Sequence, residues 1–149
     1  MSSSLGASAA IALATTLVCG AVAHEVYADP PLGRWQVVRG EFGGRPITTR
    51  DLPNGTMHFD VDGHWEGTEH GKVTGGGTWI VDESEVPATM DLRHTAGLDQ
   101  GKTQLCRYAV VGDSLTLVLG VPGERDRPSA LATVAESKPA ILFVLVRVR

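Results

Sequence analysis

The chain has 149 residues, of which 42% are hydrophobic and 20% are charged, so it is long enough for one domain with a sizeable core. This length excludes a multidomain enzyme. The formal net charge is −4, which excludes the basic surface that attracts phosphate backbones, and no nucleic-acid partner is expected.

The N-terminal residues 1–23 have the features of a secretory signal peptide. They contain no charged side chain, and Ala9–Val18 is an apolar run too short to span a bilayer. The small residues that end at Ala23 predict cleavage there; cleavage after Ala28 and an uncleaved N-terminal anchor are the alternatives. The protein is then secreted or periplasmic, with a linker at 24–31, one domain at 32–149 and no integral membrane segment after signal removal.

Cysteine usage indicates a domain without an internal disulfide. Removal of the signal peptide removes Cys19 and leaves Cys106 as the only thiol. A reactive thiol needs exposure and a lowered pKa, whereas the simpler interpretation makes Cys106 a small buried hydrophobe. We expect the second.

The rest of the chain predicts short β-strands. From Gly33 onward, apolar residues recur with period 2 between Gly, Pro, Asp and Asn, and no segment has convincing helical periodicity. The predicted strands are Trp35–Phe42, Thr56–Val61, Trp65–Glu69, Thr78–Val81, Ala88–Arg93, Thr103–Val111, Ser114–Leu119, a weak Ala130–Ala135, and Ile141–Arg147.

Two hairpins can be tested by the alternation of faces along paired strands. A two-residue Gly112-Asp113 turn of type II′ pairs Val110 with Leu115, Tyr108 with Leu117 and Cys106 with Leu119, which gives one continuous apolar face. Between the second and third strands, a three-residue loop 62–64, or another loop of the same parity, keeps Phe59 and Trp65 on one face. That loop pairs Val61 with Trp65.

Antiparallel strands in this number, each with one apolar face, predict an up-and-down β-barrel of about eight strands. Such a barrel has an interior that side chains can fill or that can hold one small ligand. The last strand is apolar on both faces, so we expect the N-terminal segment or a loop to cover its outer side.

Several motifs resemble a family of exported bacterial proteins of unknown function with a lipocalin-like barrel. They are Leu32–Val38 with its G-x-W opening, Gly44–Pro46, Trp79–Asp82, Pro87–Leu92, Tyr108–Leu117, Arg127-Pro128 and the late Arg147. The resemblance covers about residues 32–149. It implies a barrel in which the Trp closes one end and a late Arg lies across its ring, and it implies no particular ligand or reaction.

Two sets of residues follow from this expectation. Gly33, Trp35 and Arg147 form a structural plug, in which a guanidinium over the indole contributes about 0.5 to 2 kcal/mol. A list of ligand-lining candidates comes from the inward apolar faces and describes a solid core equally well: Phe59, Val61, Trp65, Trp79, Met90, Leu92, Tyr108, Val110, Leu115 and Leu117.

Other polar motifs give weaker signals. His58, Asp60 and His64 could converge on a metal near one turn, but their spacing matches no known zinc framework and equally suits a solvated edge hairpin. The glycine-rich segment Lys72–Gly77 lacks the Lys-Ser/Thr ending and the following helix of a phosphate-binding loop and is predicted to be a mobile connection.

Three functional classes remain open, and no cofactor is implied. The first is a non-enzymatic exported barrel that binds a small apolar or amphipathic ligand. The second is an interaction or inhibitor module that presents the loops Gly71–Gly77 and Gly120–Arg127 to a protein partner. The third is a metal- or haem-dependent enzyme with His58, His64, His70 or His94 as ligand.

Overall fold

The computed structural model describes residues 29–133 and 139–149, and these residues form an all-β structure without a helix. The predicted signal peptide, both predicted cleavage sites and most of the predicted linker lie outside them. The strands are β1 (Gly33–Phe42), β2 (Arg45–Pro46), β3 (Gly55–Phe59), β4 (His64–Glu69), β5 (Lys72–Asp82), β6 (Ala88–Gly97), β7 (Thr103–Val111), β8 (Ser114–Leu119) and β9 (Ile141–Arg147).

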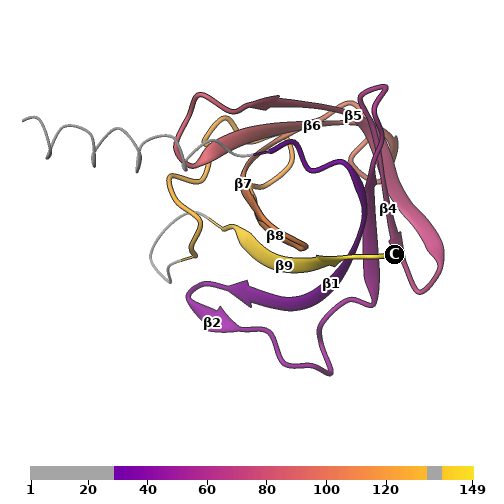
Figure 1. The fold of residues 1–149 in the computed structure, drawn as a ribbon, viewed down its shortest axis with the longest axis vertical. Coiled ribbons are helices and arrows are strands. Elements are labelled where there is room, and N and C mark those ends of the chain that lie inside the picture. The colour runs from indigo at the N-terminus through magenta and orange to yellow at the C-terminus, as the bar shows by residue number, and fades with distance from the viewer. Residues whose placement is uncertain (1–28, 134–138) are drawn as a thin grey trace, which may run out of the picture.

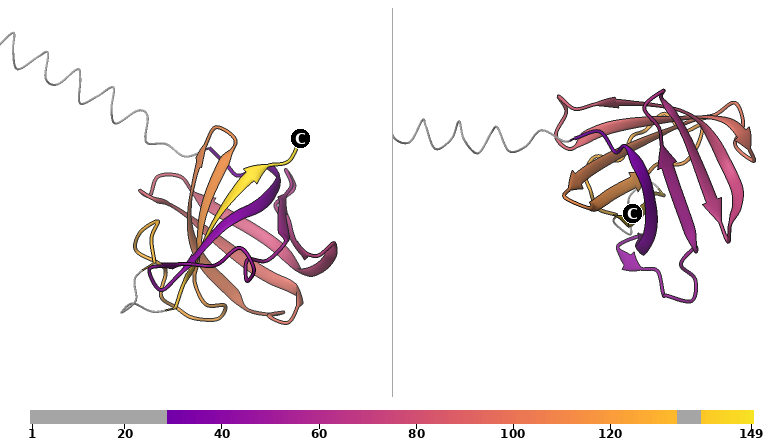
Figure 2. Two further views of the ribbon diagram at one scale, coloured as in Figure 1. Left: turned by 90° about the horizontal axis from the view of Figure 1, so that it is seen from below. Right: turned by 45° about the vertical axis from the view of Figure 1, so that its right-hand side comes forward.

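The sheet closes on itself. From β3 to β9 each strand pairs antiparallel with the next, and β1 pairs with both β3 and β9. The seam places Trp35 opposite Arg147 and Val37 opposite Leu145. The expected eight-stranded antiparallel barrel is therefore confirmed, with the short β2 added beside β1 (Figure 1) and the strands tilted as they wrap around the axis (Figure 2).

The β7–β8 hairpin has the predicted register. Val110 pairs with Leu115, Tyr108 with Leu117 and Cys106 with Leu119. Gly112 has a φ of 58°, the positive value that the first central residue of a type II′ turn requires. Local turn chemistry and the apolar pattern act together here.

The β3–β4 hairpin has the predicted parity but a different register. Phe59 pairs with Trp65, the connection between the two strands is residues 60–63, and Val61 lies in it rather than in a strand. The cause is Asp60, whose Oδ1 accepts hydrogen bonds from the backbone N–H groups of Asp62 and His64 at 3.0 and 2.9 Å. This side-chain turn ends β3 two residues early.

Two other strand predictions were wrong. The glycine-rich segment is not a connection, because Lys72–Gly77 forms the first half of β5. At Gly77 a Cβ atom would lie 1.7 Å from the carbonyl oxygen of Arg93, so glycine there permits close contact between two backbones. Residues 130–133 of the predicted weak strand are not in a strand, and the remainder of that prediction lies outside the described residues.

The segment between β8 and β9 packs on the outside of the barrel. Arg107 on β7 donates a 2.7 Å hydrogen bond to the carbonyl of Pro128, and Thr133 donates one of 2.7 Å to Glu41. On this outer side Val118 and Leu142, which pair across β8 and β9, are 0% and 6% exposed. The expected cover over the last strand is present at Leu142, whereas Val146 is exposed.

Candidate functional site

One end of the barrel is closed by Trp35 and Arg147. The Trp35 ring is fully buried, and its Nε1 donates a 2.9 Å hydrogen bond to the carbonyl of Pro31. The guanidinium carbon of Arg147 lies 4.3 Å from the centre of the Trp35 ring, and Nη1 donates a 2.8 Å hydrogen bond to the carbonyl of Leu32. The stacking that the family resemblance implied is present.

Gly33 allows this close arrangement. Its φ is 110°, which disfavours residues with a side chain, and a Cβ there would lie 3.0 Å from Arg147 Nη1. Beside this end, Asp113 accepts hydrogen bonds from Arg149 and Arg147. These bonds, Arg149 first, hold the pKa of the Asp113 carboxyl below its ordinary value.

The predicted ligand-lining residues mostly fill the interior. Phe59, Trp65, Met90, Leu92, Tyr108, Leu115 and Leu117 belong to the buried core, and Trp79 and Val110 pack against it. Phe59 and Trp79 meet edge to face with ring centres 5.9 Å apart. Val61 is the exception, because it is 82% exposed in the β3–β4 connection and lines nothing inside the barrel.

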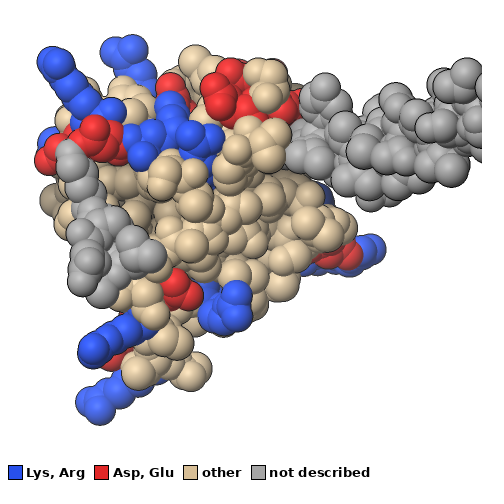
Figure 3. Space-filling model, turned by 90° about the vertical axis from the view of Figure 1, so that its left-hand side faces the viewer, with Lys and Arg blue, Asp and Glu red and all other residues tan. Residues whose placement is uncertain are grey.

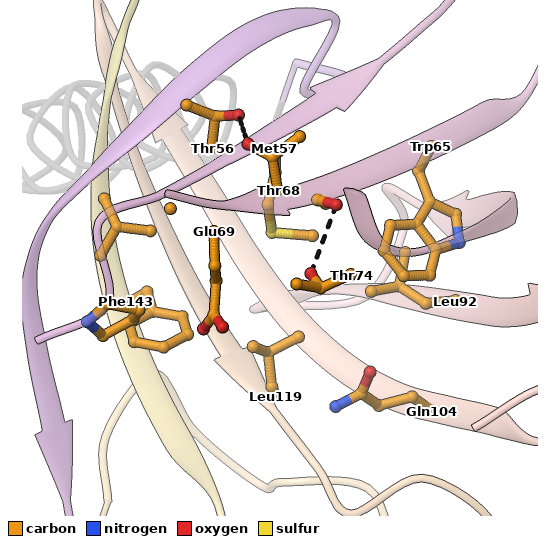
Figure 4. A pocket seen from close by; sticks show the side chains of 14 residues that line it. Thr56, Met57, Trp65, Thr68, Glu69, Thr74, Leu92, Gln104, Leu119 and Phe143 are labelled. Atoms are coloured by element: carbon orange, nitrogen blue, oxygen red, sulfur yellow. Dashed lines mark hydrogen bonds between the residues drawn. The ribbon is translucent and has the colours of Figure 1, made fainter. Parts of the chain in front are cut away.

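A cavity of about 160 Å³ opens at the other end of the barrel (Figure 4). All eight strands of the barrel wall contribute to it, and of the predicted lining residues it includes only Trp65 and Leu92. Its lining is Val37, Pro53, Gly55, Thr56, Met57, Trp65, Gly67, Thr68, Glu69, Thr74, Leu92, Gln104, Leu119 and Phe143. The other members of this lining were not predicted from the sequence.

The neutral polar side chains at the cavity form hydrogen bonds within the protein. Thr56 and Thr68 share a hydrogen bond between their hydroxyl groups, and Thr74 Oγ1 donates one of 3.3 Å to the carbonyl of Gly67. Gln104 Nε2 donates a 2.8 Å hydrogen bond to the carbonyl of Gly120. These contacts hold the polar part of the wall in place.

His94 is fixed behind this wall. It is 8% exposed, and its ring meets that of Trp65 edge to face at 4.9 Å. Because Gln104 already donates through Nε2, its Oε1 accepts a hydrogen bond of 2.9 Å from His94 Nε2. His94 therefore packs against Trp65, and its hydrogen bond with Gln104 links β6 to β7.

The residues proposed for a metal do not gather. Asp60 serves its turn, and the backbone hydrogen bond from His64 is the largest cause that lowers the pKa of its carboxyl. His64 Nδ1 lies 3.8 Å from Asp60 Oδ1, His58 is exposed on β3, and His94 is inside the barrel. Over residues 29–133 and 139–149, no three His, Cys, Asp or Glu side chains are grouped closely enough to hold a metal ion.

Cys106 is buried, as expected. It is 0% exposed between Met90 and Leu119 in the barrel register, and its Sγ lies 3.6 Å from the carbonyl oxygen of Gln104. Loss of hydration raises the pKa of the Cys106 thiol to about 12. The group is packed as an apolar side chain.

The two segments predicted to be loops for a protein partner differ in structure. The first is part of β5, as described above. The second is held against the barrel by Arg127, whose Nη1 donates to the carbonyl of Cys106 at 2.8 Å and whose Nη2 contacts Asp91 Oδ1 at 2.5 Å. Figure 3 views the side of the molecule where the β8–β9 segment lies and shows a central area without charged groups.

The geometry thus defines a closed eight-stranded antiparallel barrel with one plugged end and one open cavity. No family model, curated protein or solved structure matches the chain. Among the described residues, no helix has the length and apolar character needed to cross a bilayer.

Proposed function

We propose that this chain is an exported, non-enzymatic lipocalin-like protein that binds a small apolar or amphipathic molecule in the cavity at the open end. The cavity is the observation that carries the proposal. Apolar side chains such as Met57, Leu119 and Phe143 form most of its wall, with a few fixed polar groups among them. Small-molecule sites have this composition.

The size of the cavity limits the ligand. Its volume of about 160 Å³ is close to that of an engineered apolar cavity of about 150 Å³ that accepts benzene. Pockets for drug-sized molecules begin at roughly 300 Å³. The proposed ligand is therefore comparable to a single substituted ring, and haem or a long-chain lipid is too large for the cavity as it stands.

The hydrogen bonding and burial of the polar side chains favour a binding role over catalysis. Gln104 and His94 are hydrogen-bonded to each other, and Cys106 is buried with a raised pKa. A nucleophile activated by a neighbouring base needs the opposite arrangement. The signal-like N-terminus and the resemblance to exported lipocalin-like proteins support export.

The test is native mass spectrometry of the full-length protein expressed in and purified from its own host. We expect a bound small molecule that is lost on denaturation. Gly67 lines the cavity, and a Cβ there would make ordinary contacts of 3.5 Å with the Trp65 ring, so Gly67→Val fills the cavity without displacing the backbone. Ala109→Val, which adds bulk on β7 outside the cavity lining, is the control.

The proposal predicts that Gly67→Val loses the bound molecule and that Ala109→Val keeps it. Retention of the molecule by both variants would place binding elsewhere on the protein. A clean unliganded mass for the unmodified chain would count against the proposal and would favour a protein partner.

A further inference from the structure

The only ionisable side chain in the lining of the cavity is acidic. Of its fourteen lining residues only Glu69 is ionisable, and none is Lys, Arg or His. Figure 4 shows the Glu69 side chain extending from β4 toward Phe143 and Leu119. An anionic ligand head at this entrance would face a carboxylate with no compensating cation in the wall.

The Glu69 carboxylate is not neutralised by the protein. Over the described ranges, residues 29–133 and 139–149, it forms no ion pair. Lys72 lies opposite it in the β4–β5 register but is exposed, is not part of the lining, and holds its ammonium beyond ion-pair distance. The carboxylate is therefore available to a cation that enters with the ligand.

The wall separates two environments. Glu69 is exposed at the rim, whereas Trp65 and Leu92 are 7% and 1% exposed deeper in the barrel. A bound molecule can keep a charged group at the rim, partly hydrated, while its apolar body replaces water against the inner side chains. Phe143 beside the rim adds an aromatic ring, which attracts cations at its face.

We infer that the ligand is a small primary amine with a compact apolar body, whose ammonium group pairs with Glu69 while the body contacts Trp65, Leu92 and Leu119. This inference rests on the proposed function, since it names the ligand class of the same cavity. Its basis is the lone carboxylate in an otherwise uncharged lining and the cavity volume of about 160 Å³.

The experiment compares two probes of nearly equal shape, benzylamine and benzyl alcohol, by NMR titration of the full-length protein. Signals of Met57 and of the Trp65 indole report occupancy of the cavity. We expect benzylamine to bind at least about fivefold more tightly, equivalent to about 1 kcal/mol. Glu69→Gln should abolish that preference and leave the affinity for benzyl alcohol unchanged.

Glu66→Gln is the matched control, because Glu66 is also an exposed glutamate of β4 but does not line the cavity. It should keep the preference for the amine. Equal affinities for both probes, or a preference that survives Glu69→Gln or disappears equally in Glu66→Gln, would overturn the amine inference and leave the proposed function standing. Failure of both probes to bind would overturn the amine inference, and the proposed function would still be decided by the mass spectrometry of the purified protein.

Discussion

The two ends of this barrel are built from different kinds of inward-facing residue. At the plugged end, Trp35, Tyr108 and Leu115 are 0% exposed and belong to the buried core. At the open end, the corresponding positions include Gly55, Gly67 and several threonines, and a cavity remains. The same strands run through both ends.

The contrast shows how one sheet can serve two purposes. Large apolar side chains near the plug supply the buried area that holds the sheet closed, at roughly 25 cal/mol per Å² removed from water. Glycine and threonine near the entrance contribute little to that term and leave space with hydrogen-bonding groups. The stability of the fold is therefore concentrated away from the candidate site.

The sharpest test of this division uses two leucines of the same strand. Leu117 is fully buried, whereas Leu119, two residues along β8, is half-buried and lines the cavity. Leu117→Ala should lower the free energy of unfolding by about 3 to 4 kcal/mol, because it leaves a hole in a filled core. Leu119→Ala should cost about 1 kcal/mol, since its side chain already borders empty space.

Urea denaturation monitored by circular dichroism measures both changes. The difference between the two variants is the decisive quantity because the substitution and the strand are the same. Equal losses would mean that the open end is packed as tightly as the plugged end, and the comparison between the ends would not hold.

A smaller effect is expected at the plug itself. Arg147 and Arg149 both contact Asp113, but only Arg147 lies over Trp35 and bonds to the carbonyl of Leu32. Arg147→Lys should lower the free energy of unfolding by about 1 to 2 kcal/mol, because lysine lacks the flat guanidinium that stacks and bonds at once. Arg149→Lys should change it by less than about 0.5 kcal/mol.

Thermal or denaturant unfolding of these two variants separates the roles of the ring and of Asp113. If both substitutions had the same effect, the shared contact with Asp113 would account for it. The plug would then contribute little to the stability of that end.

The plugged end could be predicted from sequence, and the reason lies in its chemistry. Alternation of apolar residues places Tyr108 and Leu117 on one face, and the glycine at position 112 independently indicates the turn that joins their strands. Where two local signals of this kind agree, few registers remain possible. The G-x-W motif led by resemblance to Arg147.

The open end could not be predicted in the same way, because polar residues and glycines interrupt the apolar alternation at several of its inward positions. Thr68, Glu69 and Gln104 are typical of a solvent-facing surface, yet they line the cavity. Glycines 75–77 have no side chains to show a period, so the first half of β5 was predicted to be a connection. The alternation of apolar residues continues to Val61 and therefore predicted that this residue lies in a strand. In the structure, the turn at Asp60 ends the strand before Val61.

The smallest expected effect concerns Cys106, which lies between the filled core and the cavity. It pairs with Met90 on one side and with Leu119, a lining residue, on the other. Loss of hydration raises the pKa of the Cys106 thiol to about 12, which disfavours the reactive thiolate, and the buried Sγ is inaccessible. A thiol reagent of the maleimide type should leave the native protein unlabelled at Cys106 and label it rapidly in urea.

Mass analysis of peptides separates labelling at Cys106 from labelling at Cys19 where the N-terminal segment is retained. Labelling of Cys106 in the native state would show that the cavity reaches farther toward the plug than Leu92 and Leu119, and would move the boundary between the two ends.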